Sequence, residues 1–513
     1  MLIRASCFAL CLLPLPAAAQ DPLSAIDWLK QHPPTQIAIP LVPERRAEPG
    51  EPPVTSSAST PNVSVTPLDA PTVTSVGLLP SVTTGFPASL WQGSEAETLA
   101  RSLRSVPVGK LPAMQALLYT LLLAEAEAPN GAKGDAFLAA RIARLLDQGA
   151  VEAAEAMLER AGKSSPALFA LWFETALLTG RTDTACAEVL ATPHFAPGHD
   201  ALVYCHTLTG DWNTAVTVLN SADILGLISD EQAILLSLFL DPETGEDGAQ
   251  IIAPKRPTAL QYRLLQAIGE APATSALPRP FATLDIGGDA GWRAQIEAAE
   301  RLARAGTVSE NQLLGIYSER KPAASGGVWD RVSAVQNLDA SFQSGNPEKL
   351  ASDLARAWSE MGRAGLSVPF ARMFAPKLKA VDLPTDSLPL ARQVLLLSPA
   401  YETAAQGFGA ATSDQEKLLL GIAQGTPELP QARTDLEIAI VEGFTIAPPD
   451  TVAPMLQNNR LGELILSTMS DLASGAAGNV TRIPPALATL RAIGLEDTAR
   501  RTALQLLLPR PIS

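Results

Sequence analysis

Few residues of this chain are spaced in a way that supports catalysis. Ser318 and Lys321 form an S-x-x-K pair, in which a lysine one turn away can activate a serine nucleophile. The S-x-N and K-T-G elements that accompany such a pair are not evident, so we interpret Ser318 as part of a charged helix end. The four histidines fall in no zinc-protease motif, and no serine-hydrolase, P-loop or dinucleotide motif occurs. The sequence therefore predicts no catalytic residue, no metal ligand and no cofactor.

Paired carboxylates are the remaining route to catalysis. Two acidic side chains roughly 5–10 Å apart can cleave a glycosidic bond, and the chain holds 53 Asp and Glu residues. Their pairing depends on the fold, so a glycan-active or peptidoglycan-active envelope protein stays open as an alternative function. Acidic residues on helices more commonly form a solvated face.

A loop before a predicted helix is the best candidate for a ligand site. Glycines in that position can direct backbone N–H groups at an anion, and the helix dipole adds to the attraction. The candidate ligand loop consists of Arg320, Lys321, Ser325, Gly326, Gly327 and Trp329. Because of this loop, a small-molecule or anion-binding module is a further alternative function. The simpler interpretation is an ordinary loop between repeats, with Asp330 in the first turn of the following helix.

Residues 1–19 have the three parts of an export signal. Arg4 supplies the positive end, Ala5–Leu15 is apolar, and an A-x-A site ends at Ala19, where we expect cleavage. Lipid attachment is disfavoured, because Cys11 does not follow a small residue. No later run reaches about 18 uncharged apolar residues. We therefore expect a periplasmic or secreted protein with no membrane insertion after signal cleavage.

Cys186 and Cys205 are the two cysteines that follow the signal. Each lies in a predicted helix, and Pro193 and Pro197 mark the turn between them. In an oxidising compartment two such cysteines predict one disulfide, whose loop contributes about 3 kcal/mol in the chain-entropy model. Free buried thiols stay open. A zinc site formed with three nearby histidines also stays open, although the spacing fits no established ligand pattern. These histidines are His194, His199 and His206.

The elements that position these residues are predicted to be helices. Hydrophobic residues make up 47% of the chain but aromatic residues only 5%, a profile typical of packed helices. Amphipathic segments punctuated by Gly or Pro follow one another from Ser94, which forms a capping box with Glu97. In the first block we expect helices near 94–105, 112–127, 135–147, 150–161, 165–178, 182–191, 199–208, 212–224 and 230–240. A short helix near 258–268 follows. In the second block we expect helices near 291–305, 309–319, 328–344, 347–363, 386–396, 399–409, 414–424, 433–445, 459–472, 484–493 and 496–507.

A degenerate repeat organises the first block. The segments LLDQGAVEAAEAMLERA, LLTGRTDTACAEVLATP and TLTGDWNTAVTVLNSA align on Gly149, Gly180 and Gly210, which are 31 and 30 residues apart. A small residue follows five positions after each glycine, where two helices can approach closely only if the side chain is small. This pattern resembles tetratricopeptide-like repeats over about 135–225, although its period is shorter and its aromatic and proline positions are missing. The resemblance implies an α-solenoid of antiparallel helix pairs.

Part of the second block carries another resemblance. The segment GWRAQIEAAERLARAGTVSENQLLGIYSERKPAASGGVWDRVSAVQ is similar to a group of exported bacterial helical proteins of unknown activity.

Domain organisation follows from shifts in composition. After the signal we expect an extended or disordered Pro/Ser/Thr-rich tether over 20–93, a helical-repeat block over 94–240, a Pro/Gly-rich linker over 241–290 and a second helical-repeat block over 291–513. The tether carries a candidate partner anchor, formed by Leu23, Ile26, Trp28 and Leu29. Its apolar island from Val63 to Trp91 is expected to lie against a folded surface.

These features favour a non-catalytic scaffold or protein-interaction module of the cell envelope. A stacked helical array offers a long concave surface that suits a protein partner. Nucleic acid is excluded as a partner, because a net charge of −15 repels phosphate backbones.

Overall fold

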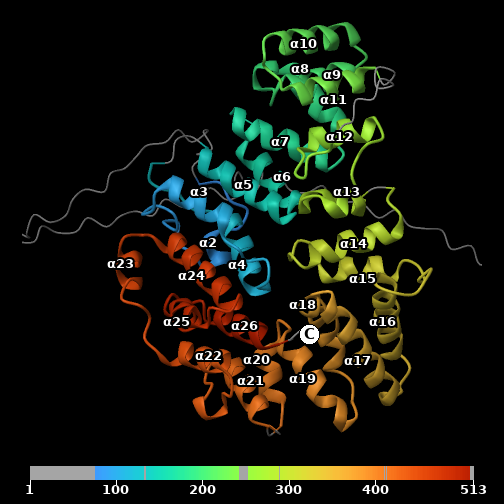
Figure 1. Cartoon of the computed structure of the whole chain (residues 1–513). Coiled ribbons are helices and arrows are strands. Elements are labelled where there is room, and N and C mark those ends of the chain that lie inside the picture. Colours follow the sequence, from blue (N-terminus) through green and yellow to red (C-terminus); the bar gives the residue numbers. More distant parts are fainter. Residues whose placement is uncertain are drawn as a thin grey trace, which may run out of the picture. The chain divides into compact units, whose positions relative to one another are not determined.

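The computed structural model describes residues 75–508, except 132–134, 164, 242–251, 288, 410 and 412. The export signal and the candidate partner anchor (Leu23, Ile26, Trp28 and Leu29) lie outside these residues. Within the described part the chain forms 25 α-helices and no β-strand (Figure 1). The all-α solenoid predicted from the sequence is confirmed. None of the described helices is long and apolar enough to cross a membrane.

The helices of the first block agree with the predicted ranges to within a few residues. They are α3 (Ala96–Ser105), α4 (Pro112–Leu123), α5 (Ala136–Gln148), α6 (Val151–Ala161), α7 (Pro166–Leu178), α8 (Thr182–Ala191), α9 (His199–Leu208), α10 (Trp212–Ile224) and α11 (Asp230–Leu240). A short α2 (Ser81–Thr84) precedes them. The interval that follows contains α12 (Ala259–Ala267), the 3₁₀ turns η4 (Thr274–Ala276) and η5 (Arg279–Phe281), and α13 (Ala282–Gly287).

The second block also follows the predicted pattern, with two additions. Its helices are α14 (Trp292–Ala303), α15 (Glu310–Ser318), α16 (Val328–Ser341), α17 (Pro347–Arg363), α18 (Ser367–Leu378), α19 (Leu388–Leu396), α20 (Tyr401–Gly407), α21 (Asp414–Gln424), α22 (Asp435–Thr445), α23 (Val452–Gln457), α24 (Leu461–Ala476), α25 (Ile483–Ala492) and α26 (Glu496–Leu507). The additions are α23 and α18. Helix α18 contains Pro369 in its first turn and Pro376 in its interior, and proline disfavours a helix in a prediction from sequence alone.

The repeat glycines act as predicted. Gly149, Gly180 and Gly210 have φ values of 80°, 76° and 83°, the left-handed conformation that ends a helix. The small residues five positions later, Ala154 and Ala185 among them, are completely buried. Each turn therefore leads directly into a closely packed helix.

The predicted capping box at Ser94 is wrong. Helix α3 begins at Ala96 with Glu95 as its cap, and no side chain caps it. Instead, the backbone N–H of Ala96 donates to the carbonyl oxygen of Asn130, 3.0 Å away. A distant loop thus satisfies one of the free N–H groups at the start of α3, and Ser94 itself is buried.

The described end of the N-terminal segment packs against the first helices. Val76, Phe86, Leu90 and Trp91 are buried, as expected for the apolar island that ends at Trp91. Arg141 of α5 fastens this segment, because its buried guanidinium donates to carbonyl oxygens of Val76, Leu122 and Ala124. Burial lowers the pKa of Arg141 to about 10.

Helices near the two ends of the described chain are in contact. Helix α4 packs against α26, and α3 packs against α24 (Figure 1). The N–H of Ala113 donates to the side-chain oxygen of Gln505 over 2.8 Å, and the N–H of Gly462 donates to the Leu90 carbonyl over 2.9 Å. The packing runs from α4 through α5, η5, α13, α14, α15, α18, α19, α20, α21 and α26 back to α4. The solenoid therefore forms a closed circuit, which the sequence did not predict.

Candidate functional site

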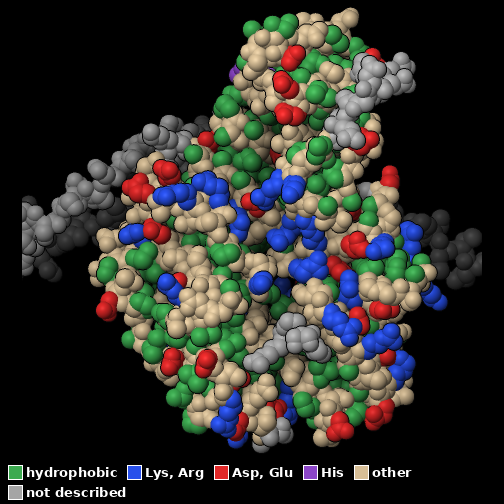
Figure 2. Space-filling model, in the orientation of Figure 1, with side chains coloured by type: hydrophobic (Ala, Val, Ile, Leu, Met, Phe, Trp, Pro, Cys, Tyr) green, Lys and Arg blue, Asp and Glu red, His purple; other side chains and the backbone are tan. Residues whose placement is uncertain are grey.

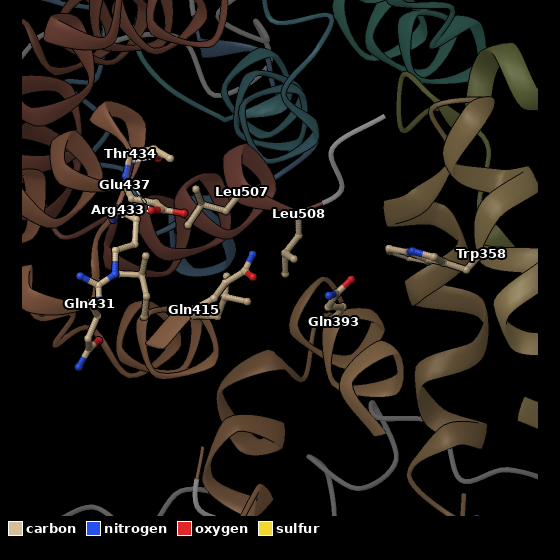
Figure 3. Close-up of a pocket in the computed structure, with 11 residues that line it drawn as sticks. Trp358, Gln393, Gln415, Gln431, Arg433, Thr434, Glu437, Leu507 and Leu508 are labelled. Atoms are coloured by element: carbon tan, nitrogen blue, oxygen red, sulfur yellow. Dashed lines mark hydrogen bonds between the residues drawn. The ribbon is translucent and has the colours of Figure 1, made fainter. Parts of the chain in front are cut away.

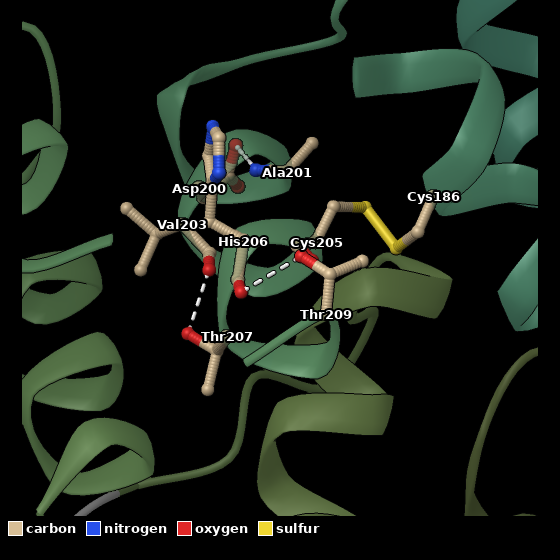
Figure 4. Close-up of a disulfide and its surroundings, with 8 residues drawn as sticks. All are labelled: Cys186, Asp200, Ala201, Val203, Cys205, His206, Thr207 and Thr209. Atoms are coloured by element: carbon tan, nitrogen blue, oxygen red, sulfur yellow. Dashed lines mark hydrogen bonds between the residues drawn. A yellow bond between two sulfur atoms is a disulfide. The ribbon is translucent and has the colours of Figure 1, made fainter. Parts of the chain in front are cut away.

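The predicted disulfide joins two neighbouring helices. Cys186 of α8 and Cys205 of α9 are bonded, their Cα atoms are 4.9 Å apart, and both are buried (Figure 4). Helix α9 packs against α8, α10 and α11. We call α8–α11, from Thr182 to Leu240, the disulfide block. The bridge holds this block together at its first helix pair.

Exposed apolar side chains gather on the disulfide block. Half of the large hydrophobic residues exposed in the described part of the chain lie between Leu208 and Ile234. We call them the apolar surface: Leu208, Trp212, Val216, Ile224, Leu225, Leu227 and Ile234. Ile224 is 84% exposed, and Trp212, 47% exposed, lies one turn from Val216 on α10. Figure 2 shows apolar side chains at the surface over these helices. Such a concentration of exposed apolar area is typical of interaction surfaces.

The residues of the disulfide block carry charge of one sign. The sequence contains no Lys or Arg from Thr182 to Pro254. The acidic side chains beside the apolar surface include Asp211 and Glu231, and hydrogen bonds lower the pKa of both. For Asp211 these bonds come first from Thr214, with smaller contributions from His206, whose Nδ1 lies 3.4 Å from a carboxylate oxygen of Asp211. The block is therefore apolar and anionic at neutral pH.

The candidate ligand loop lies beside a shallow hollow of about 510 Å³. Arg320, Lys321 and Trp329 line it, together with Trp292 and Arg293 of α14. The rings of Trp292 and Trp329 lie 5.2 Å apart. The structure thus brings three of the predicted loop residues together on an open surface.

One glycine of this loop already has an acceptor within the chain. The N–H of Gly326 donates to the carboxylate of Asp330 over 3.1 Å, so one of the expected anion donors is already satisfied. Gly327 precedes α16 with a φ of 56°, and Ser325 is exposed. The arrangement matches the simpler interpretation, in which Asp330 serves the start of the next helix.

A buried carboxylate lies close to this loop. Glu300 of α14 accepts two hydrogen bonds from Arg331 at 2.8 and 2.7 Å, and one from the hydroxyl of Tyr317 at 2.9 Å. Burial raises the pKa of Tyr317 well above its usual value, and the Glu300 charge adds to the effect. Because each carboxylate oxygen has a donor, we assign Glu300 to the fold rather than to proton transfer.

A second hollow, of about 440 Å³, is lined by amide side chains (Figure 3). Gln393, Gln415 and Gln431 reach it from three elements, and Trp358 faces it from α17. Glu437 is the one carboxylate among its described lining residues, and it accepts from the N–H groups of Arg433 and Thr434 at 2.7 and 3.0 Å. Glycan cleavage requires a pair of carboxylates, and this hollow presents one, occupied by the start of α22.

The histidines near the disulfide do not converge on a common point. The ring of His194 lies beside that of Phe195 at an angle of 44°, whereas His206 pairs with Asp211. The described residues contain no group of three or more His, Cys, Asp or Glu side chains able to hold a metal ion.

The chain matches no family model, no curated protein and no solved structure. Sequence reasoning missed the apolar surface, although a signal was present in the long interval without Lys or Arg around α10.

Proposed function

We propose that this protein is a non-catalytic scaffold of the bacterial cell envelope, exported to the periplasm and built from degenerate tetratricopeptide-like repeats. Its disulfide block binds a partner protein through the apolar surface. The export signal predicted over residues 1–19 and the disulfide both fit an oxidising compartment outside the cytoplasm.

One observation carries the proposal: a cluster of exposed apolar side chains in a block without cations. Burying Trp212, Ile224 and their neighbours against a partner removes apolar area from water. The surrounding acids select what can approach, because like charges across an interface are costly and opposite charges steer association. The partner is accordingly an amphipathic segment with an apolar face and flanking Lys or Arg.

A second copy of the same block is a poor occupant. Two such blocks bring only carboxylates to the edges of the contact, since no Lys or Arg occurs between Thr182 and Pro254. Light scattering of the exported chain should therefore show no association that depends on the apolar surface. Association that Trp212→Ser abolishes would identify a self-docking surface instead.

The proposal is tested with a synthetic peptide that has Leu on one helical face and Lys on the other. Calorimetry should detect its binding to the exported chain, and a Glu-for-Lys version should not bind. Trp212→Ser should weaken binding by about 2 kcal/mol, the scale of a central aromatic contact. Leu429→Ser is the matched control, because Leu429 is 53% exposed but lies outside the block. Equal affinity for both peptides, or equal loss in both variants, would contradict the proposal.

A further inference from the structure

Four arginines from three separate segments influence one another's charge. They are Arg144 of α5, Arg279 of η5, and Arg301 and Arg304 at the end of α14. Arg279 is repelled by Arg144 and Arg304, and Arg301 is repelled by Arg279 and Arg304. We call these four residues the arginine cluster. In an acidic chain of net charge −15, such a concentration of positive charge requires a physical reason.

Backbone carbonyl groups hold three of the four guanidinium groups. Arg144 donates to the carbonyl oxygen of Val106 over 2.7 Å, and Arg304 donates to that of Ala364 over 3.0 Å. Arg301 donates to the carbonyl oxygens of two further residues, Thr274 at 3.0 Å and Leu277. A guanidinium has five N–H donors, so each of these arginines keeps donors that face elsewhere.

Arg279 is held by its carbon chain alone. Its Cγ lies 3.1 Å from the point where a Cβ of Gly149 would stand, so the side chain crosses the end of α5. Among the described residues its guanidinium makes no hydrogen bond and no ion pair, although it is half-buried. The Nε of Arg144 is likewise buried without an acceptor in the described part of the chain. The buried Nε of Arg144 is costly without an acceptor, and the guanidinium of Arg279 keeps its donors available to a ligand.

Nearby carboxylates compensate the cluster only in part. Asp147 attracts Arg144 and Arg279, and Asp285 attracts Arg301, but none of these contacts is a salt bridge. Glu300 lies 3.9 Å from Arg304 and is itself held by Arg331. Burial is the main cause that lowers the pKa of Arg279, and repulsion by the other arginines lowers it further.

We propose that the arginine cluster binds a phosphate-type oxyanion, and more specifically a diphosphate-bearing small molecule. Arginine forks pair with phosphate oxygens through two parallel hydrogen bonds. Four guanidinium groups suit a ligand with more than one negative charge. Figure 2 shows Lys and Arg side chains gathered around a hollow in the middle of the visible face. Because three of the arginines are half-buried, a free small anion reaches them more easily than a flat lipid surface does.

Inorganic pyrophosphate is the probe for this site. Calorimetry on the exported chain, at matched ionic strength, should show saturable binding. Arg279→Gln should weaken it at least tenfold, because a hydrogen bond to a charged group is worth about 1.5–3 kcal/mol. Arg482→Gln is the matched control, since Arg482 is exposed and already paired with Asp471.

A stability measurement distinguishes a binding role from a structural one. Without ligand, Arg279→Gln should melt at the same temperature as the wild type or higher, because it loses no hydrogen bond and relieves repulsion. A lower melting temperature would make Arg279 a structural residue and overturn the proposal.

Three further outcomes would also overturn it. The first is no saturable binding of pyrophosphate. The second is equal affinity for citrate, which would indicate a general anion site. The third is binding to phosphatidylglycerol vesicles in the absence of pyrophosphate binding, which would make a membrane the ligand.

Discussion

The disulfide block and the arginine cluster carry opposite charge within one acidic chain. The block has no Lys or Arg from Thr182 to Pro254, whereas the cluster brings four arginines together. Net charge alone therefore describes neither surface. The block suits an apolar partner with cationic edges, and the cluster suits a small anion.

The two regions are also held in different ways. The block depends on a covalent bridge and on small buried residues such as Ala185 and Ala215. The cluster depends on carbonyl oxygens from irregular segments, including those of Thr274 and Ala364. This difference decides how each region responds to mutation.

The largest effect is expected where a buried arginine is fully satisfied. Arg141→Met leaves buried carbonyl oxygens of Val76, Leu122 and Ala124 without their donor, at ~1–3 kcal/mol each. We expect a loss of about 4 kcal/mol in the free energy of unfolding, measured by urea denaturation. Arg279→Met is the matched comparison and should cost almost nothing. Similar losses in both variants would erase the distinction between a structural and a ligand-binding arginine.

Loss of the disulfide should act on one region and spare the other. Cys186→Ala combined with Cys205→Ala removes a bridge between positions 19 residues apart, which is worth about 3 kcal/mol in the chain-entropy model. Binding of the Leu/Lys peptide should fall, because the apolar surface lies on the helices that the bridge holds. Pyrophosphate binding should stay unchanged. A parallel fall in both affinities would mean that the two regions unfold together.

Local signals in the sequence predicted most of the fold. Glycines such as Gly149 and Gly210 ended helices where expected, because only glycine adopts a positive φ without strain. Two cysteines in neighbouring helices were sufficient to predict the bridge. Helix α18 was missed because its prolines are tolerated only through contacts with other helices.

The arginine cluster could not be predicted, for a related reason. Its members are separated by up to 160 residues, and three of them are held by carbonyl oxygens that carry no sequence preference. The contact between α4 and α26, which closes the circuit, was not predicted for the same reason. Contacts such as that of Ala113 with Gln505 use backbone donors. The candidate ligand loop, by contrast, was found from local glycines, but Asp330 already uses one of its donors.

The repeat glycines allow a finer comparison of the two regions. A Cβ at Gly149 would collide with Leu302 and approach Arg279, whereas Gly180, just before the disulfide block, has open space around it. Gly149→Ala should therefore cost about 2 kcal/mol and weaken pyrophosphate binding by displacing Arg279. Gly180→Ala should cost about 1 kcal/mol, from its positive φ alone. Chemical denaturation and calorimetry measure both effects, and an unchanged pyrophosphate affinity in Gly149→Ala would separate Arg279 from the site.

The smallest expected effect is on the pH dependence of stability, through two acidic residues of the disulfide block. Burial is the main cause that raises the pKa of Asp200, even though its carboxylate accepts from Ala201 N–H at 3.0 Å and Gln232 at 3.3 Å. The folded state therefore favours the protonated form of Asp200, and the ionised carboxylate destabilises the fold at pH 7. This destabilisation disappears as the pH falls through the raised pKa toward the ordinary value of about 3.9. The advantage of Asp200→Asn over the wild type in thermal melts should shrink from pH 7 to pH 4.5.

Asp211 is the control with the opposite sign. Hydrogen bonds, first from Thr214, lower its pKa, so its contribution is present above the ordinary value and is lost only as pH falls through the lowered one. Asp211→Asn should consequently keep the same difference from the wild type between pH 7 and pH 4.5. If the two variants changed in parallel over this range, burial of Asp200 would not be the cause, and the block would titrate through its net charge instead.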